Sequence, residues 1–434
     1  MEVAEVQLDH RRLSRRQVLL GAFGLSLGTA APLLSACGPD NGAPTDAPTA
    51  PASGTQQPSA LPAAPASPTA PLGPPAATLR ATATPTSSLS LPSFALYRSD
   101  ARRSGSVDLP GRRSQPAVAW EREIGPSSPP LAAGSELLIA TAAGDLLMLD
   151  AASGESRREL PLGGSAIAAP TLADGRLFVG VNDVGLLALD ADTGTELWLT
   201  PGQGIIWGSP LVDDSTVYFG DETRFAALDV ATGDERFSIP ADGRIYSPAA
   251  AYEGLVYVPL GTRLLALDAE SGEVAWERAA PLDWNRLAVD ADVVYCGAED
   301  GICYALDRLS GTERWRSAQA GNFWTAPAVT EQLVVIGNVD GRIFAFDRAS
   351  GAERWSFTAE DWATADPVIC GGVIYAGVGN HEGRAGAQPL YALDLASGEL
   401  LWSFTTDGLI HAGVAVDAER IYVVTTTGLL YALG

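Results

Sequence analysis

The chain has 434 residues, of which 46% are hydrophobic and 18% charged, and its formal net charge is −24. All 28 basic residues are arginine, which excludes chemistry that depends on a lysine amine, such as Schiff-base formation. Nucleic acid is not an expected partner, because binding to phosphate requires clustered positive charge.

The first 36 residues resemble an export signal, so we do not expect them to belong to the folded domain. Arg15 and Arg16 lie in a stretch that resembles a twin-arginine motif, and an uncharged apolar run, Val18 to Leu34, follows it. This run leads into the letters LSAC, which resemble the site where a signal peptidase cuts before a lipid-modified cysteine, Cys37. The sequence therefore predicts export by the twin-arginine route and a lipid anchor on Cys37.

The same apolar run could instead form a single membrane-spanning helix. Its length of about 17 residues is at the lower limit for spanning a bilayer, and glycines and Pro32 interrupt it. We therefore favour the lipoprotein interpretation, which places the protein on the outer face of the cytoplasmic membrane, or in the periplasm or outer membrane.

Residues 37–95 are rich in Pro, Ala, Ser and Thr and have few large apolar side chains. Such a segment cannot bury enough apolar surface to offset the entropy lost on ordering. It is predicted to be a disordered linker between the lipid anchor and one folded domain over residues 96–434.

The folded domain repeats one motif, an apolar run followed by Asp-x-x-Ser/Thr-Gly and then by a short segment that usually ends in Trp. The motif aspartates follow one another at intervals of 40, 39, 39, 39, 40 and 47 residues. They are Asp150, Asp190, Asp229, Asp268, Asp307, Asp347 and Asp394. Periods of about 40 residues are typical of solenoids and propellers.

Each copy predicts a β-hairpin, because the aspartate can accept backbone N–H bonds and the glycine can adopt positive φ. Further short strands precede each hairpin, as in TVYFG (Thr216 to Gly220) and VVYCG (Val293 to Gly297). Four short strands in about 40 residues correspond to one propeller blade. The third strands, such as LLALD, are apolar at successive positions, so both of their faces must be covered, as they are between stacked blades.

The two ends of the domain complete the count of blades. Trp120 stands in the column that follows the turn, and the chain ends at Gly434 where another turn would begin. The fold class is therefore all-β: an eight-bladed β-propeller with four-stranded antiparallel blades, closed by pairing of the N- and C-terminal segments.

The repeated ALDxxSGxxxW resembles the tryptophan-docking motif of the pyrroloquinoline-quinone-like β-propellers, and Tyr97 to Gly105 resembles the segment that often precedes such propellers. Two groups share this motif. One contains the quinoprotein dehydrogenases, and the other contains non-catalytic lipoproteins such as that of the outer-membrane β-barrel assembly machinery. The resemblance implies a propeller but does not decide between these functions.

Resemblance to the dehydrogenases would imply a quinone cofactor held against a disulfide between adjacent cysteines, beside a carboxylate-bound metal ion. The cysteines here, Cys37, Cys296, Cys303 and Cys370, are not adjacent to one another. No catalytic residue, cofactor or metal site is therefore predicted, although the many carboxylates leave calcium binding open. Cys296 and Cys303 lie on two arms of one hairpin; they could form a disulfide, but buried free thiols are the favoured alternative.

Aromatic side chains recur where the first strand of a blade is expected to begin. The candidate binding residues at one mouth of the axial channel are Trp207, Tyr246, Trp284, Trp324, Trp362 and His411. Exposed Trp and Tyr are enriched at protein interfaces, but the same rings could plug the channel or pack between blades. An insertion, Gly377 to Leu390, accounts for the long interval and is expected to form a loop at the rim.

These features favour a non-catalytic, membrane-anchored scaffold outside the cytoplasm that binds an unknown protein partner. The family resemblance implies envelope protein assembly as its process. The alternative is a redox or sensor protein that binds pyrroloquinoline quinone or another small ligand.

Overall fold

The computed structural model describes residues 94–98, 100–241, 245–319, 321–379, 386–410 and 413–434. Within these ranges the regular elements are β-strands, and no helix there is long and apolar enough to span a membrane. The predicted signal with Arg15 and Arg16, the lipidation site Cys37 and almost all of the linker lie outside the described residues.

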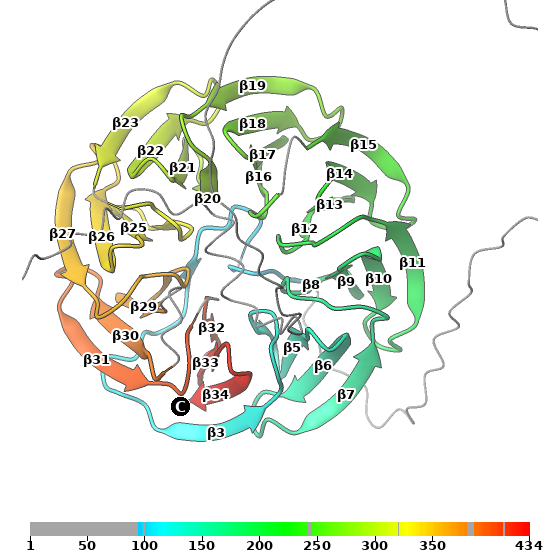
Figure 1. Cartoon of the computed structure of the whole chain (residues 1–434), viewed down its shortest axis with the longest axis horizontal. Coiled ribbons are helices and arrows are strands. Elements are labelled where there is room, and N and C mark those ends of the chain that lie inside the picture. The colour runs from blue at the N-terminus through cyan, green and yellow to red at the C-terminus, as the bar shows by residue number, and fades with distance from the viewer. Residues whose placement is uncertain (1–93, 99, 242–244, 320, 380–385, 411–412) are drawn as a thin grey trace, which may run out of the picture. The chain divides into compact units, whose positions relative to one another are not determined.

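The strands form eight antiparallel blades around one axis, as the repeat predicts. Figure 1 shows the first strand of each blade nearest the axis and the fourth strand on the outer wall. We number the blades in chain order from β4 onward. The all-β, eight-bladed fold class is thus confirmed.

The first four blades follow the same order of strands along the chain. Blade 1 contains β4 (Leu131–Ala133), β5 (Glu136–Ala140), β6 (Asp145–Asp150) and β7 (Ser156–Pro161). Blade 2 contains β8 (Thr171–Ala173), β9 (Arg176–Val181), β10 (Gly185–Asp190) and β11 (Glu196–Pro201). Blade 3 contains β12 (Leu211–Asp213), β13 (Thr216–Gly220), β14 (Arg224–Asp229) and β15 (Glu235–Pro240). Blade 4 contains β16 (Ala250–Tyr252), β17 (Leu255–Leu260), β18 (Arg263–Asp268) and β19 (Val274–Ala279).

The next three blades repeat this order. Blade 5 contains β20 (Trp284–Val289), β21 (Val293–Ala298), β22 (Ile302–Asp307) and β23 (Glu313–Ala318). Blade 6 contains β24 (Ala328–Val329), β25 (Leu333–Gly337), β26 (Arg342–Asp347) and β27 (Glu353–Thr358). Blade 7 contains β28 (Val368–Cys370), β29 (Val373–Gly377), β30 (Pro389–Asp394) and β31 (Leu400–Thr405).

Blade 8 is built from both ends of the folded domain. The C-terminal strands β32 (Ala415–Val416), β33 (Ile421–Val424) and β34 (Leu429–Leu433) supply its inner part, and β3 (Val118–Glu123) supplies its outer strand. Trp120 pairs with Ala432 and Glu123 with Leu429. The predicted closure by pairing of the two terminal segments is therefore confirmed.

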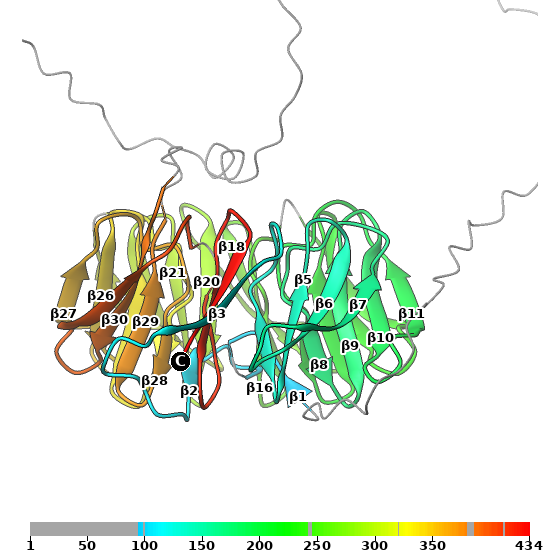
Figure 2. The ribbon, with the colours of Figure 1, turned by 90° about the horizontal axis from the view of Figure 1, so that it is seen from below.

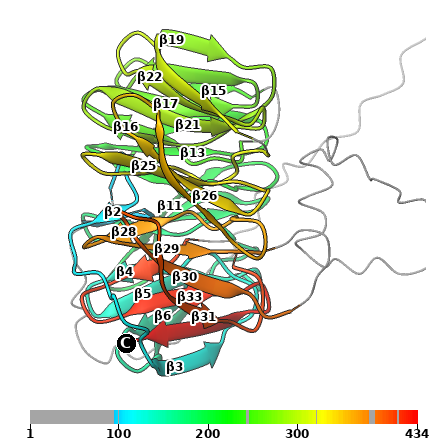
Figure 3. The same cartoon turned by 90° about the vertical axis from the view of Figure 1, so that its left-hand side faces the viewer.

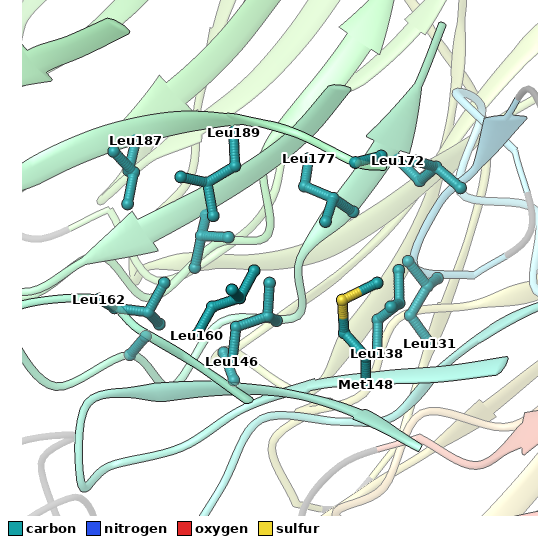
Figure 4. Packing of buried hydrophobic residues seen from close by; sticks show 14 of the residues in the cluster. Leu131, Leu138, Leu146, Met148, Leu160, Leu162, Leu172, Leu177, Leu187 and Leu189 are labelled. Atoms are coloured by element: carbon teal, nitrogen blue, oxygen red, sulfur yellow. The ribbon is translucent and has the colours of Figure 1, made fainter. Parts of the chain in front are cut away.

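Stacking of neighbouring blades explains why the second and third strands are apolar at successive positions. In β18 the four residues Leu264 to Leu267 are all buried, because one face packs on blade 3 and the other on blade 5. Figure 4 shows the equivalent leucine layer between blades 1 and 2, which includes Leu138, Leu146, Leu177 and Leu189. Each fully buried leucine contributes about 2 kcal/mol of hydrophobic stabilisation.

The Asp-x-x-Ser/Thr-Gly segments form the expected turns between third and fourth strands. In blade 1 the Asp150 carboxylate accepts hydrogen bonds from the Ser153 N–H at 2.8 Å and the Ser153 hydroxyl at 3.0 Å. Gly154 has φ +72° and donates its N–H to the Asp150 carbonyl at 2.8 Å. The same arrangement recurs in the six other copies, so the turn chemistry inferred from the motif is present.

In five of the blades the tryptophan that follows the turn donates a hydrogen bond to the next blade. The Trp276 ring lies against Gly311, the turn glycine of blade 5, and its Nε1 donates to the Arg308 carbonyl at 2.9 Å. Equivalent hydrogen bonds are Trp120 to Ala151, Trp198 to Val230, Trp315 to Arg348 and Trp355 to Leu395. The tryptophan and the glycine of the motif therefore contact each other across a blade boundary, which is why both recur at one period.

Cys296 and Cys303 are buried free thiols, as favoured from the sequence. In the hairpin Cys296 pairs with Tyr304, and Cys303 pairs with Gly297. Because side chains alternate between the two faces of a sheet, the two sulfurs lie on opposite faces, one in the core shared with blade 4 and the other in the core shared with blade 6. The disulfide alternative is therefore wrong.

The chain before β3 enters the ring, which the sequence did not indicate. Strand β1 (Phe94–Ala95) pairs with β8, and β2 (Ser106–Val107) runs parallel to β28. Between them, the Ala101, Arg102, Ser104 and Gly105 carbonyls accept hydrogen bonds from the first strands of blades 4, 5, 6 and 7. We call residues 94–107 the inner strap. Figure 1 shows its described part in cyan in the middle of the ring, and Figures 2 and 3 show the chain continuing along one side to β3.

Candidate functional site

The two sides of the ring carry different loops. We call the side with the Asp-x-x-Ser/Thr-Gly turns the lower face; β1 and β2 also lie near it (Figure 2). The opposite side, the upper face, carries the turns between second and third strands and the connections between blades. The candidate aromatic residues that the structure describes belong to connections of the upper face or to the residues that follow them.

Trp207 and Trp324 occupy one position in their blades, as their equal spacing to Pro210 and Pro327 predicts, and Tyr246, which is one residue nearer to Pro248 in the sequence, takes the same position. Trp207, Tyr246 and Trp324 are partly exposed and each follows a buried residue, Ile206, Ile245 or Phe323, that packs on a second-strand glycine of the preceding blade. The Trp207 and Tyr246 rings are 5.6 Å apart between centroids. The upper face therefore has aromatic surface that extends across a blade boundary.

Trp284 does not belong to this surface, contrary to the sequence alignment. It is 1% exposed, its Nε1 donates to the Thr262 carbonyl at 3.1 Å, and its ring lies 4.9 Å from that of Tyr304. Trp284 pairs with Ala298 in the position where Phe323 pairs with Asn338 in blade 6. The stretch from Trp284 to Ala288 is one residue shorter than the equivalent stretch from Phe323 to Ala328. Trp284 thus takes the buried position, and the packing alternative applies to it.

Trp362 lies two residues before the common position and is also partly exposed. Its backbone N–H donates to the Asp361 carboxylate at 2.8 Å, and its carbonyl accepts from the Gly379 N–H at 2.9 Å. His411 and the insertion residues 380–385 lie outside the described residues. We call Trp207, Tyr246, Trp324 and Trp362 the aromatic arc.

A buried polar cluster centred on Asp366 lies where the inner strap meets three of the blades. Its carboxylate accepts hydrogen bonds from the Tyr97 hydroxyl at 2.8 Å, from Arg286 at 2.8 Å and from the Ala326 N–H at 2.9 Å. Arg98 is 3.6 Å from the same carboxylate. These contacts join the inner strap to blades 5, 6 and 7.

The pKa of Asp366 reflects a balance of burial and charge. Burial by itself raises the pKa of a carboxyl, but the Arg286 and Arg98 guanidinium groups and the Ala326 N–H outweigh it, so the pKa of Asp366 is held below its ordinary value. The cluster is therefore an ionised carboxylate among cations, and it is structural in character.

A second buried arginine anchors the strap to the blades. Arg103 is 0% exposed, and its guanidinium donates to the Ala249, Tyr97, Ser209 and Pro210 carbonyls at 2.6 to 3.2 Å. The strap was recognised in the sequence only as a segment that precedes the propeller. Because arginine and aspartate are usually exposed, no sequence signal marked Arg98, Arg103 and Asp366 as buried, or Arg286 as a partner of Asp366.

These residues do not fit a quinone site with a carboxylate-bound metal ion. Both oxygens of Asp366 are engaged by protein donors, and the inner strap occupies the axis beside it. Within the described residues, no three His, Cys, Asp or Glu side chains are grouped so that they could hold a metal ion.

Comparison with known proteins connects this arrangement to one family. The family model described as outer membrane protein assembly factor BamB matches residues 106–204, 199–283, 260–387 and 386–434. The sequence matches none of the curated proteins.

Among solved structures, BamB from Moraxella catarrhalis is similar, with a TM-score of 0.60 and 17% identity over 73% of this chain and 99% of that chain. The quinohemoprotein alcohol dehydrogenase from Comamonas testosteroni has a TM-score of 0.65 and 16% identity, over 77% of this chain and 79% of that chain. A computationally designed protein, Ika8, has a TM-score of 0.63 and 16% identity, over 74% and 99% of the two chains. Likenesses of this degree show a shared fold, which a scaffold and an enzyme both use.

Proposed function

The chain belongs to the family of the outer membrane protein assembly factor BamB, and on that premise we propose that it is a non-catalytic docking scaffold of the cell envelope. Its aromatic arc would bind a segment of a protein partner. Envelope protein assembly is the process that the family suggests for it.

The proposed location comes from the sequence. Arg15 and Arg16 resemble a twin-arginine signal and Cys37 a lipidation site, so we propose that the mature protein is tethered to a membrane outside the cytoplasm through two or more acyl chains. The linker that follows Cys37 would let the propeller reach partners at a distance from the bilayer.

The observation that carries the docking proposal is the aromatic arc. Large aromatic rings that remain partly exposed on one face supply contact area at low cost in side-chain entropy. Each ring that a partner covers would contribute about 1 to 3 kcal/mol. The buried contacts of Asp366 support a non-catalytic role, because they leave the axial carboxylate in a structural network.

Removal of two rings of the arc tests the proposal. The full chain and its Trp207→Ala/Trp324→Ala variant would be used to capture proteins from solubilised membranes, and each captured protein would be identified. We expect one protein to be retained by the native chain and lost with the variant, while the thermal unfolding midpoint changes little. The Leu197→Ala/Leu199→Ala variant, which truncates exposed side chains of the outer wall, is the control and should retain that protein.

Two results would overturn the proposal. One is capture that is equal for the native chain and the Trp207/Trp324 variant. The other is quinone absorbance with stoichiometric calcium in the purified native chain, since this would identify a cofactor protein.

A further inference from the structure

We propose that the upper face selects a basic segment of its partner, whose lysine or arginine side chains lie on the aromatic arc between the surrounding carboxylates. This inference rests on the proposed docking function and adds the chemistry of the partner. Charge complementarity on this face is the observation that identifies the occupant.

The described loops of the upper face are acidic. They include no arginine, and the whole sequence contains no lysine. Their carboxylates that are at least partly exposed are Asp183, Glu222, Asp283, Glu299, Asp300, Asp340, Glu360, Asp361 and Asp407. The stretches 242–244 and 380–385 each contain one arginine and one carboxylate in the sequence, so they do not alter the net charge of these loops.

The arginines nearest to these loops are directed to the outer wall. They begin third strands, and each forms an ion pair with a glutamate of its own fourth strand. The pairs are Arg224–Glu235, Arg263–Glu277 and Arg342–Glu353. Near the axis, Arg286 is paired with Asp366 at 2.8 Å. These cations therefore do not neutralise the loops around the aromatic arc.

The lower face differs, because arginines match its turn aspartates. Four fourth-strand arginines form ion pairs with the aspartates of their own turns: Arg157 with Asp150, Arg236 with Asp229, Arg314 with Asp307 and Arg354 with Asp347. Both faces are rich in carboxylates, but this repeated matching belongs to the lower one. The aromatic arc lies on the upper face, so carboxylates and partly exposed rings are combined there.

Two residues of the aromatic arc are each preceded by a loop that contacts a carboxylate in the same way. Gly204, with φ +71°, lies three residues before Trp207, and the Glu222 carboxylate packs over it. Gly321, with φ +79°, lies three residues before Trp324, and the Asp340 carboxylate packs over it. A Cβ at either glycine would collide with the carboxylate, so the close approach requires glycine. In blades 3 and 6 a carboxylate thus contacts the loop that leads into a tryptophan of the aromatic arc.

Such a pair suits a cationic side chain. Lysine and arginine are attracted to the face of a tryptophan ring by its quadrupole, with about 0.5 to 2 kcal/mol depending on desolvation. A carboxylate beside the ring adds charge attraction, and an acidic face also increases the rate at which a basic segment associates.

Peptide binding tests the inference directly. The full chain in detergent would be titrated against a fluorescent peptide that alternates arginine with leucine, and against the same peptide with glutamate in place of arginine. We expect the arginine peptide to bind and the glutamate peptide not to bind. Salt should weaken the binding, because exposed charges are screened beyond about 10 Å at 0.1 M ionic strength.

Matched charge variants locate the contact. Glu222→Gln/Asp340→Asn should weaken binding of the arginine peptide about tenfold. Glu196→Gln/Glu273→Gln removes the same charge from exposed positions on the fourth strand and at a lower-face turn and should change it less than about twofold. Equal binding of both peptides, or equal effects of the two charge variants, would overturn the inference.

The two proposals fail differently. A protein captured from membranes that is lost with the Trp207/Trp324 variant but fully retained with the Glu222/Asp340 variant would support docking and exclude a basic partner. Loss with both variants, and retention with the Glu196/Glu273 control, would support both.

Discussion

The tryptophan at the end of a fourth strand satisfies two needs of the neighbouring blade. The tryptophan ring covers the turn glycine, which adopts positive φ and has no side chain to fill the space. The indole N–H donates a hydrogen bond to a carbonyl beside the turn. Arg158 stands in this column in blade 1, and its guanidinium donates to the Ala191 and Asp192 carbonyls. In blade 1 an arginine therefore makes the hydrogen bond to the next blade in place of a tryptophan.

The docked glycine should tolerate substitution poorly. Gly311 has φ +67°, and a Cβ there would lie 2.7 Å from the Trp276 ring. We expect Gly311→Ala to lower the free energy of unfolding by about 2 kcal/mol or more, from backbone strain and displacement of the ring. Gly254 has φ +78° with no atom within 4 Å of its Cβ position. Gly254→Ala should show the strain alone, so equal losses in urea denaturation would contradict the docking contact.

Substitution of Trp284 and of Trp324 should lower the free energy of unfolding by different amounts in the same urea denaturation measurement. Trp284→Ala leaves a cavity in the core between blades 4 and 5 and should cost about 3 to 5 kcal/mol. Trp324 is partly exposed, so Trp324→Ala should cost about 1 kcal/mol. A larger loss of stability for Trp324 would mean that its ring is packing material and not binding surface.

Among the elements, the inner strap differs most from what the repeat predicts. Periodic copies and a turn signature specify each blade from local sequence, so the hairpins, their order and the closing strand β3 could be predicted. The strap has no periodicity, and its buried arginines bond carbonyls of several blades that are far apart in the chain. Its position depends on the closed ring, which no local pattern contains.

The same distinction applies to the candidate site. The positions of Trp207 and Trp324 follow from their equal spacing to Pro210 and Pro327, whereas Tyr246 is one residue closer to Pro248. Spacing misplaced Trp284, because the blade 5 segment is shorter by one residue and the backbone bulges between Trp284 and Leu287. One residue is enough to exchange a buried for an exposed position.

Asp366 should make the attachment of the strap depend on pH. Its pKa is lowered in the folded protein, so its stabilising contribution is complete above its ordinary pKa of 3.8 and is lost as the pH falls below that value. Asp366→Asn should cost about 3 to 5 kcal/mol at neutral pH, because it leaves the buried Arg98 and the partly buried Arg286 without a counter-charge. The variant should also lose less stability than the native chain between neutral pH and acid, measured by urea denaturation. An equal loss in both would show that Asp366 does not titrate in this way.

At the scale of the whole molecule, the repeated turns give acid sensitivity to the complete ring. Hydrogen bonds from Arg157 and Ser153 hold the pKa of Asp150 at about 2, and those from Arg314 and Ser310 hold that of Asp307 at about 2. Groups with lowered pKa stabilise the fold above their ordinary pKa and cease to do so as the pH falls through the folded value. We therefore expect the free energy of unfolding to fall steadily from about pH 4 to pH 2. A flat profile over this range, measured by urea denaturation, would contradict the role of these turns.

The ring also gives the protein two chemically distinct faces, and the proposed function depends on which of them meets the partner. Site-specific photo-crosslinking in native membranes tests this most directly, with a photoreactive amino acid placed at Trp324 on the upper face or at Leu309, which is 67% exposed in a lower-face turn. We expect a discrete crosslinked protein from position 324 and none from position 309. Crosslinks from position 309 alone, or equal products from both positions, would contradict partner binding at the aromatic arc.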